Sequence, residues 1–292
     1  MAMGTVFELQ IDSEDVKYAK SAAVEAFRLL DSLEQLLSRF IVNSDVSRIN
    51  SLVVGQSTRI SVTSFECLLQ CVDMYLITHG VFDVTIGELY HVWLNDDMSL
   101  KQPSSMEIEL ARRHVGIQHL EFDDLDFSVT MRGGPVKIDL GGFGKGFAVD
   151  RMAELLIEWD IDSFVINGGQ SSLRFGAPPH DQPGWLITLS DPFNGFQEFR
   201  RLHLAHTSIS SSGIQKGAHI IDPRTGYPVR EKRASWSLSP SASCAEGWST
   251  AFMIMNLAEI SQRCTANKDL KALILTADDS PLEKRLATHG EI

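Results

Sequence analysis

The sequence contains little cysteine. Its four cysteines, Cys67, Cys71, Cys244 and Cys264, are spread over 292 residues and form no Cys-x-x-Cys pair. A disulfide framework or a zinc site built on cysteine pairs is therefore not indicated. Cys67 and Cys71 are four residues apart in a predicted helix. We expect reduced, mostly buried thiols, which are typical of a cytoplasmic protein.

An excess of positive charge and long apolar runs are also missing. The chain has 26 Lys and Arg against 38 Asp and Glu, a net charge of −12, which argues against a general nucleic-acid binder. No apolar run approaches the ~20 residues that span a bilayer. The first residues, Met-Ala-Met-Gly-Thr, lack the basic and apolar segments of a signal peptide. We therefore expect a cytoplasmic protein, or a periplasmic or membrane-anchored one if the chain has been trimmed.

The pattern of apolar residues predicts a mixed α+β fold. Alternation predicts strands at 5–11, 127–131, 162–167 and 185–189, and Gly133-Gly134 indicates a hairpin turn into a strand at 136–140. Neither an internal repeat nor a low-complexity linker divides the chain. We expect one domain, residues 1–292, with an antiparallel-rich sheet and helical insertions rather than a regular βα alternation.

Two long helices are predicted in the first third of the chain. The first is capped by Asp12 or Ser13 and runs to about Leu37. Its expected buried stripe is Ala23, Phe27, Leu30, Leu33 and Leu37. A capping box, Thr63-x-x-Glu66, predicts the start of the second helix, which ends at Gly80. Residues 39–50 between them are polar and are predicted to form a loop.

A glycine-dense stretch at 139–150 is the strongest candidate for ligand binding. It joins a short apolar run at 135–138 to a predicted helix that carries Val149, Met152, Leu155 and Trp159. Glycines let a ligand approach the backbone, and a helix N-terminus favours an anion. Neither the Walker A pattern nor Gly-x-Gly-x-x-Gly is present, so a purely structural turn is an equal alternative. Asp139 and Lys145 are the candidate anchors for a polyphosphorylated ligand.

An aromatic segment at 81–93 contains one acid in apolar surroundings, Asp83. Such a segment is most often core. It also has the composition of a wall for a flat aromatic ligand, which needs apolar faces and a few polar contacts.

Residues 218–228 place His219, Asp222, Arg224 and Thr225 in a loop that proline and glycine hold rigid. A lone histidine is usually structural, but this density of titratable and anion-binding groups favours a functional loop.

Residues 245–250 precede an apolar helical run at 251–257. Glu246 and Thr250 are four residues apart and share a helix face, with Ser249 adjacent. One carboxylate with hydroxyls and nearby carbonyls suits Mg²⁺ or Ca²⁺. A helix cap made of the same residue types is an equally good interpretation.

Taken together, these blocks resemble the ApbE-type FAD:protein FMN transferases. The matching blocks, in chain order, are Met-Gly-Thr (3–5), Leu-Ser-Arg-Phe with Ser-Arg-Ile-Asn (37–40 and 47–50), Phe-Asp-Val-Thr-Ile-Gly (82–87), Asp-Leu-Gly-Gly-Phe-Gly-Lys-Gly-Phe-Ala (139–148), His-Ile-Ile-Asp-Pro-Arg-Thr-Gly-Tyr-Pro (219–228) and Ala-Glu-Gly-Trp-Ser-Thr-Ala (245–251). The resemblance spans nearly the whole chain and implies an ApbE-like fold related to the T-fold core.

The resemblance implies Mg²⁺-dependent transfer of FMN from FAD to a threonine or serine of a target protein, with release of AMP. Two alternatives remain open, an FAD pyrophosphatase that produces FMN and AMP, and a catalytically silent FAD-binding protein. An oxidoreductase with bound flavin is less favoured, because nothing in the sequence resembles a nicotinamide site.

The same resemblance implies a role for each matched position. The FAD site would comprise Met3, Phe40, Val81, Phe82, Asp83, Asp139, Lys145 and Ile221, with Met3 and Phe40 at the flavin ring. The metal ligands would be Glu246, Ser249, Thr250 and the backbone carbonyl of Gly142. His219 would approach the cofactor, and it is the best candidate for a general base that takes the proton of the attacking threonine.

Four positions depart from the family pattern. Glu246 replaces the usual metal-binding aspartate, and Gly-Gly-Gln-Ser-Ser at 168–172 lacks the acid that many relatives carry. Only five residues, 214–218, separate Gly213 from His219, and Gly87 is followed by Glu88 in place of proline. Glu246 and the short segment 214–218 are the features that most favour the silent binder.

Overall fold

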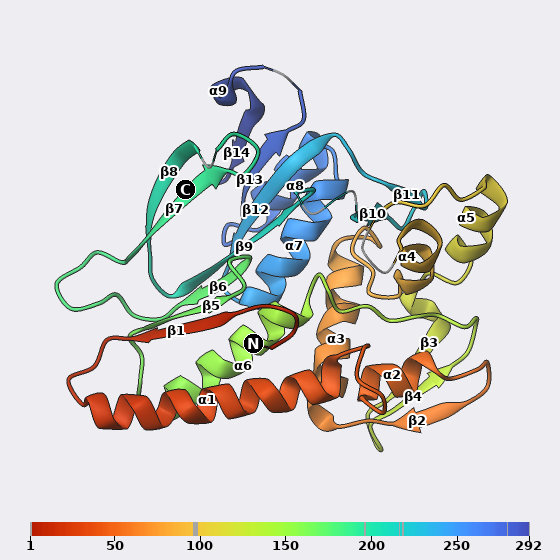
Figure 1. Cartoon of the computed structure of the whole chain (residues 1–292), viewed down its shortest axis with the longest axis horizontal. Helices are drawn as coiled ribbons and strands as arrows, with labels where there is room; N and C mark the ends of the chain where they lie inside the picture. Colours follow the sequence, from red (N-terminus) through yellow and green to blue (C-terminus); the bar gives the residue numbers. More distant parts are fainter. Residues whose placement is uncertain are drawn as a thin grey trace.

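The fold centres on one seven-stranded antiparallel sheet (Figure 1). The computed structural model describes residues 2–95, 99–195, 197–215, 217, 219–278 and 280–291. In spatial order the strands are β1 (Phe7–Ile11), β5 (Phe164–Gly168), β6 (Ser172–Phe175), β9 (Thr207–Gly213), β12 (Lys232–Ser239), β13 (Lys271–Thr276) and β14 (Leu286–His289). Every neighbouring pair is antiparallel, which confirms the expected antiparallel-rich α+β architecture.

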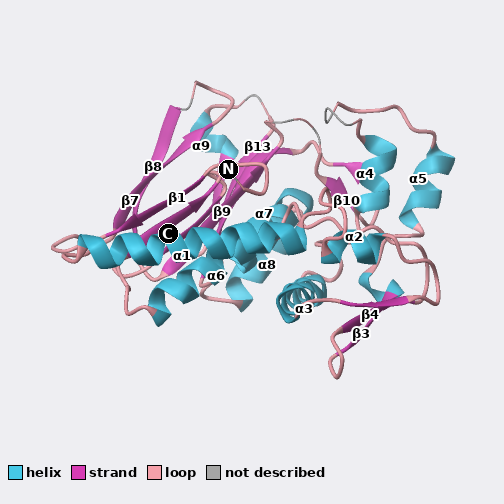
Figure 2. Ribbon diagram, turned by 60° about the horizontal axis from the view of Figure 1, so that its bottom comes forward, coloured by secondary structure: helices cyan, strands magenta, loops and turns pink. Residues whose placement is uncertain are grey.

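Each face of the sheet is covered by a different layer (Figure 2). Helices α1 (Val16–Leu37), α6 (Gly144–Glu158), α7 (Ala242–Ile254) and α8 (Leu257–Ala266) lie on one side. The hairpin of β7 (Trp185–Asp191) and β8 (Gln197–Leu204) lies on the other, over an apolar cluster that includes Phe175, Leu189 and Trp236. The short helix α9 (Leu282–Arg285) leads into β14.

A second group of elements lies beside the helical layer (Figure 1). It contains α2 (Asp45–Asn50), α3 (Val62–Ile77), α4 (Gly87–Trp93), α5 (Ser105–Arg112) and the 3-10 turn Ile117–His119. It also contains the small sheet β2 (Ser57–Arg59), β4 (Ser128–Met131) and β3 (Leu120–Asp123), and the two-residue strands β10 (Ile221–Asp222) and β11 (Tyr227–Pro228).

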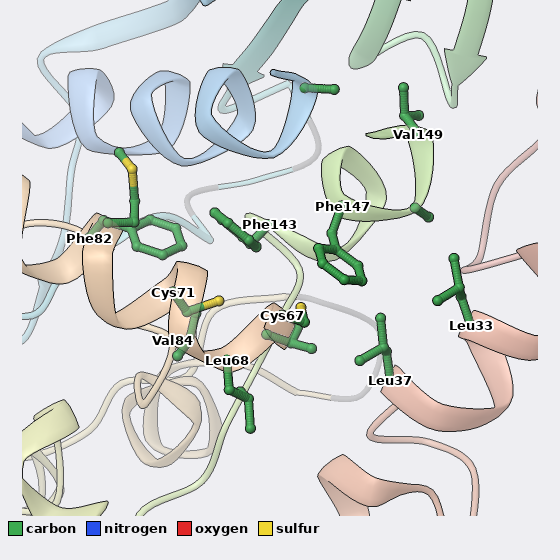
Figure 3. Packing of buried hydrophobic residues seen from close by; sticks show 14 of the residues in the cluster. Leu33, Leu37, Cys67, Leu68, Cys71, Phe82, Val84, Phe143, Phe147 and Val149 are labelled. Carbon is green, nitrogen blue, oxygen red and sulfur yellow. The ribbon is translucent and has the colours of Figure 1, made fainter. Parts of the chain in front are cut away.

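One continuous apolar core joins this group to the helices on the sheet. Figure 3 shows Cys67 and Cys71 of α3 on the side of that helix that faces Phe143 and Phe147 at the start of α6. Both phenylalanines are at most 1% exposed. The site described below lies along this junction, so its walls are held by core packing rather than by mobile loops.

The cysteines follow the prediction closely. Cys67, Cys71 and Cys264 are buried and unpaired with another cysteine, and Cys244 is half-buried. Burial raises the pKa of the Cys71 thiol well above its usual value, and the neighbouring Cys67 adds to that rise. These thiols therefore pack as small apolar side chains.

The predicted hairpin between residues 127 and 140 is wrong. Strand β4 ends at Met131 and pairs with β2 and β3, whereas 136–140 makes only a single parallel bridge, between Lys137 and Ile86. A glycine pair marks a turn, but the partner strand is chosen by tertiary packing, which a local pattern does not contain.

Three details of the predicted helices also differ. Helix α1 is capped by Asp15 and buries Ala22 and Ala26, whereas Phe27 is 37% exposed. Ser61, not Thr63, caps α3. Residues 45–50 form α2, whose N-cap is Ser44, where a loop was expected. Each error is a shift of one to three residues or a single short helix, which local propensity does not fix.

None of the helices in the described part of the chain is long and apolar enough to cross a membrane.

Candidate functional site

The glycine turn is anchored at its start by Asp139. The backbone N–H of Asp139 donates to Val84 O at 2.7 Å, and its Oδ1 accepts from the Gly141 N–H at 2.7 Å. Its Oδ2 lies 2.7 Å from Nε of Arg39. Asp139 is only 8% exposed, so this ion pair and hydrogen bond compensate for the burial of its charge. The turn therefore has a fixed starting geometry.

The N-terminus of α6 meets the side chain of Glu246. The Gly146 N–H donates to Glu246 Oε2 at 2.7 Å, and the Lys145 ammonium forms an ion pair with Oε1. A Cβ on Gly146 would lie 2.4 Å from Ala242 O, so glycine is required for the close approach of α6 and α7. Glu246 is 3% exposed, and its carboxylate sits where free helix N–H groups favour a negative charge.

Helix α7, which carries Glu246, is held at both ends by buried charges. At its start, Asp150 of α6 accepts hydrogen bonds from the N–H groups of Ala242 and Ser243, each at 2.8 Å. At its end, the ammonium of Lys232 donates to the carbonyls of Met253 and Met255. A carboxylate at the N-terminus and a cation at the C-terminus both complement the helix dipole. The position of Glu246 relative to the turn is thereby fixed.

Glu246 lies inside α7 rather than at its cap. The helix begins at Ala242, and Ser241 is the N-cap, accepting from the Cys244 N–H. The interpretation of residues 246–250 as a helix cap is therefore wrong. Their carboxylate and hydroxyl groups have other partners.

A group of hydroxyls joins α7 to the central sheet. Ser212 Oγ on β9 lies 2.8 Å from Ser249 Oγ and 3.2 Å from Thr250 Oγ1. Ser249 Oγ donates to Glu246 O at 2.9 Å, and Ser235 Oγ on β12 donates to Ser249 O at 2.6 Å. Ser249 is fully buried, whereas Thr250 is partly exposed.

A cavity lies in front of Thr250. It contains about 370 Å³ of empty space, part of which opens to solvent. Seven of the predicted site residues line it: Val81, Phe82, Asp83, Asp139, Gly142, Ile221 and Thr250. The cavity brings together four blocks that are far apart in the sequence, because the segment after α3, the glycine turn, strand β10 and α7 converge there.

Asp83 is a titratable residue in the lining of the cavity. Its Oδ1 accepts from the Thr85 N–H at 2.8 Å and from the Thr85 hydroxyl at 2.6 Å. Burial raises its pKa from 3.8 to about 6, and the hydrogen bonds from Thr85 oppose that rise. A carboxyl that titrates close to neutral pH in a cavity is a candidate ligand-binding group.

Some predicted residues lie outside the lining of this cavity. Lys145 and Glu246 form an ion pair with each other, and neither is a lining residue. His219 is half-buried, and its Nδ1 lies 2.8 Å from Gly217 O, while its neighbours Ile220 and Ile221 line the cavity. Phe40 is 80% exposed, and the Arg39 guanidinium lies 4.4 Å from its ring centre. Met3 has a positive φ of 50°, and its N–H donates to Glu34 Oε1 at 2.6 Å.

Three residues of this region were not singled out by the sequence. Arg39 links the ring of Phe40 to the carboxylate of Asp139. Tyr90 lines the cavity, and burial raises the pKa of its hydroxyl, with the Asp139 charge adding to the rise and Arg39 opposing it. Ser212 contacts both hydroxyls of α7. Arg39 stands in a matched motif, which is a usable signal, whereas Tyr90 and Ser212 are recognisable only in three dimensions.

The donors near the cavity fit a hard cation. Within the described residues no group of three or more His, Cys, Asp and Glu side chains could hold a metal ion. A cation site here would therefore combine fewer than three such side chains with hydroxyl and carbonyl oxygens, for which Glu246, Thr250 and Gly142 are candidates. A Cβ on Gly142 would lie 3.0 Å from Thr250 Oγ1, so the turn and the helix are close enough to share a ligand. An all-oxygen set of this kind suits Mg²⁺.

Comparison with known proteins shows similarity along nearly the whole chain. The model of the ApbE family matches residues 3–274. A FAD:protein FMN transferase of Buchnera aphidicola subsp. Schizaphis graminum is 30% identical over 244 residues, 78% of this chain and 71% of that protein. Another, of Vibrio cholerae, is 24% identical over 291 residues, 95% of this chain and 86% of that protein.

Solved structures share the fold. A flavin transferase ApbE from Vibrio cholerae has a TM-score of 0.85 at 22% identity and covers 99% of this chain and 94% of that one. The ApbE protein from Thermotoga maritima has a TM-score of 0.86 at 25% identity and covers 100% of this chain and 95% of that one. The resemblance seen in the six sequence blocks is confirmed by the family model and by the fold: the chain belongs to the ApbE family.

Proposed function

We propose that this protein transfers FMN from FAD to a threonine or serine hydroxyl of a target protein, with release of AMP. The relatives named above are FAD:protein FMN transferases, which supports the reaction class. The observation that carries the proposal is the cavity, which is lined both by the carboxylates of Asp83 and Asp139 and by Gly142 of the glycine turn and Thr250 of α7. We infer that residues 1–292 act as one unit, which the continuous core supports.

The cavity suits one part of a large dinucleotide. Its apolar lining, which includes Val81, Phe82 and Ile221, offers faces to a planar or ribityl group, and the carboxylates accept from hydroxyls. Met3 and Phe40 would enclose the flavin ring outside the cavity. Because Phe40 is exposed and stacks with Arg39, it presents a ring face that a second flat ring can cover.

In the proposed reaction the acceptor hydroxyl attacks the phosphorus of the FMN half of FAD. A new P–O bond forms to the acceptor oxygen, the bond to the AMP phosphate breaks, and the hydroxyl proton is removed by a base. His219 is the proposed base, since it adjoins the two isoleucines of the cavity wall. Lys145 would add positive charge next to the diphosphate.

The proposed metal ligands are Glu246, Ser249, Thr250 and the Gly142 carbonyl. Bound Mg²⁺ would supply charge neutralisation at the phosphoryl oxygens. Glu246 is already oriented by the Gly146 N–H, so one of its carboxylate oxygens is fixed by α6. Lys145 shares the same carboxylate, which makes it the group that must adjust when a cation binds.

The test is to incubate the purified protein with FAD and Mg²⁺ and to separate nucleotides by liquid chromatography. We expect AMP to form in proportion to an added threonine-bearing acceptor, with loss of the reaction in EDTA. FMN and AMP in equal amounts without any acceptor effect would identify an FAD pyrophosphatase instead.

A catalytically silent FAD-binding protein is the second candidate. It is favoured by one observation: both carboxylate oxygens of Glu246 already have partners in the protein, Lys145 and the Gly146 N–H. FAD that binds and remains intact in the presence of Mg²⁺ would support this candidate over both enzymes.

A further inference from the structure

The hydroxyls between β9 and α7 form a chain whose direction follows from counting hydrogens. Each hydroxyl has one hydrogen to donate. Ser249 Oγ contacts the carbonyl oxygen of Glu246 at 2.9 Å, and since a carbonyl only accepts, Ser249 donates its hydrogen there. In the 2.8 Å contact between Ser212 and Ser249, the donor must therefore be Ser212.

The same count of hydrogens shows that the hydroxyl of Thr250 is a donor. Ser212 has already given its hydrogen to Ser249, so in its 3.2 Å contact with Thr250 it accepts and Thr250 donates. The chain runs from Thr250 through Ser212 and Ser249 to the Glu246 carbonyl. The last of these contacts is ordinary in length, whereas the Thr250 contact is long and correspondingly weaker.

This direction matters for a cation ligand. A hydroxyl that binds a cation must point its hydrogen away and its lone pairs toward the ion. Thr250 sends its hydrogen to the sheet, and its oxygen lies 3.0 Å from the position of a Cβ on Gly142, on the side of the cavity. The usual alternative for a helical threonine, donation to the carbonyl four residues earlier, meets competition, because Ser249 already donates to that carbonyl of Glu246.

We propose that Ser212 is a positioning residue that prepares Thr250 to bind the cation by accepting its hydrogen. This inference rests on the proposed metal-dependent function and adds to it a residue on the central sheet. It also assigns the two neighbouring hydroxyls different tasks. Of the two hydroxyls in the proposed ligand set, Thr250 keeps the role of cation ligand. Ser249 is fully buried with its hydrogen and one lone pair engaged, so we reassign it from ligand to the middle member of the hydrogen-bond chain.

Strand β9 offers a matched control. Ser210 lies two residues before Ser212, so both side chains point to the same face of the sheet. Ser210 Oγ also contacts another serine hydroxyl, that of Ser172 at 3.2 Å, and it donates to Ser171 O at 2.6 Å. Ser210→Ala therefore removes a serine hydroxyl of the same strand, with a hydroxyl contact of the same 3.2 Å length, without touching Thr250.

The experiment measures binding of Mn²⁺, a substitute for Mg²⁺ at oxygen sites, by electron paramagnetic resonance of the free ion, with and without ADP. Residues that orient a metal ligand commonly change affinity by about 10- to 100-fold. Because the Thr250 contact is long, we expect Ser212→Ala to weaken binding by about tenfold, near the lower end of that range, and Ser210→Ala by less than threefold.

A double-mutant cycle tests the route of the effect. If Ser212 acts through Thr250, adding Ser212→Ala to Thr250→Ala changes affinity no further. Equal losses in Ser212→Ala and Ser210→Ala, or additive losses in the double variant, would overturn the inference. If Thr250→Ala weakens binding and Ser212→Ala does not, the proposed metal site stands and the role of Ser212 is wrong. If the unaltered chain binds no Mn²⁺ under either condition, both proposals are wrong.

Discussion

Replacing Asp83 with Asn should make the folding stability of this protein depend less on pH. In the folded state burial raises the pKa of the Asp83 carboxyl to about 6, whereas the pKa of an exposed aspartate carboxyl is 3.8. Well below pH 3.8 the carboxyl is protonated in both states, and Asp83 then costs no folding stability. As pH rises through about 6, the folded state must hold a buried charge, and stability is lost.

The size of this loss follows from the shift. The rise of the Asp83 pKa from 3.8 to about 6 corresponds to a loss of at most roughly 3 kcal/mol in the free energy of unfolding once the pH is well above 6. Asn is isosteric with Asp, carries no charge, and still offers an oxygen to the N–H and hydroxyl of Thr85. Asp83→Asn should therefore match the unaltered protein near pH 4 and become more stable by up to about 3 kcal/mol near pH 8.

Urea unfolding followed by circular dichroism between pH 4 and pH 8 measures this difference directly. Asp73→Asn is the charge-matched control, because it removes one carboxylate from an exposed position of α3. A stability difference between Asp83→Asn and the unaltered protein that stays constant over this pH range would refute the reasoning, as would an equal pH dependence in the control.

Three further predictions concern the helices and the base. Gly146→Ala should lower the free energy of unfolding by more than about 3 kcal/mol, because its Cβ would lie 2.4 Å from a backbone oxygen of α7. Gly144→Ala is the control and should cost much less, because its Cβ would lie 3.3 Å from a side chain. Similar urea midpoints for the two variants would contradict this prediction. Lys232→Met should cost about 1–3 kcal/mol, since the last carbonyls of α7 lose a buried donor. Unchanged stability of that variant would show that these carbonyls find another partner. His219→Ala should lower the rate of FMN transfer by about 100-fold or more, and a rate within a few-fold of the unaltered protein across pH would remove His219 from the proposed role.

The sequence predicted the parts of the site that are written in local motifs. One cavity is lined by Gly142, Asp139 and residues 81–83. These residues could be identified beforehand because each belongs to a block with its own glycine or aromatic pattern. The sheet-plus-helix class and the buried cysteines followed from periodicity and composition. Such features depend on short-range chemistry, which is why a single sequence contains them.

The features that were missed depend on packing between distant segments. Strand β4 pairs with β2, about 70 residues earlier in the chain, and with β3, which a turn at 124–127 joins to it; the turn residues Gly133 and Gly134 identified neither partner. The serine hydroxyls of β9 and β12 that contact α7 were missed for the same reason. Ser212 and Ser235 lie on different strands and contact α7 only after the sheet has formed. No spacing rule within one segment connects them.

The most direct test of the proposed FMN transfer is the intact mass of a threonine-bearing acceptor after incubation with this protein, FAD and Mg²⁺. We expect the mass of the acceptor to increase by that of one FMN less one water, with one AMP released per modified acceptor. The acceptor mass should stay unchanged when EDTA is added or when the acceptor threonine is replaced by alanine. An unmodified acceptor together with intact FAD and no AMP would contradict the proposed transfer.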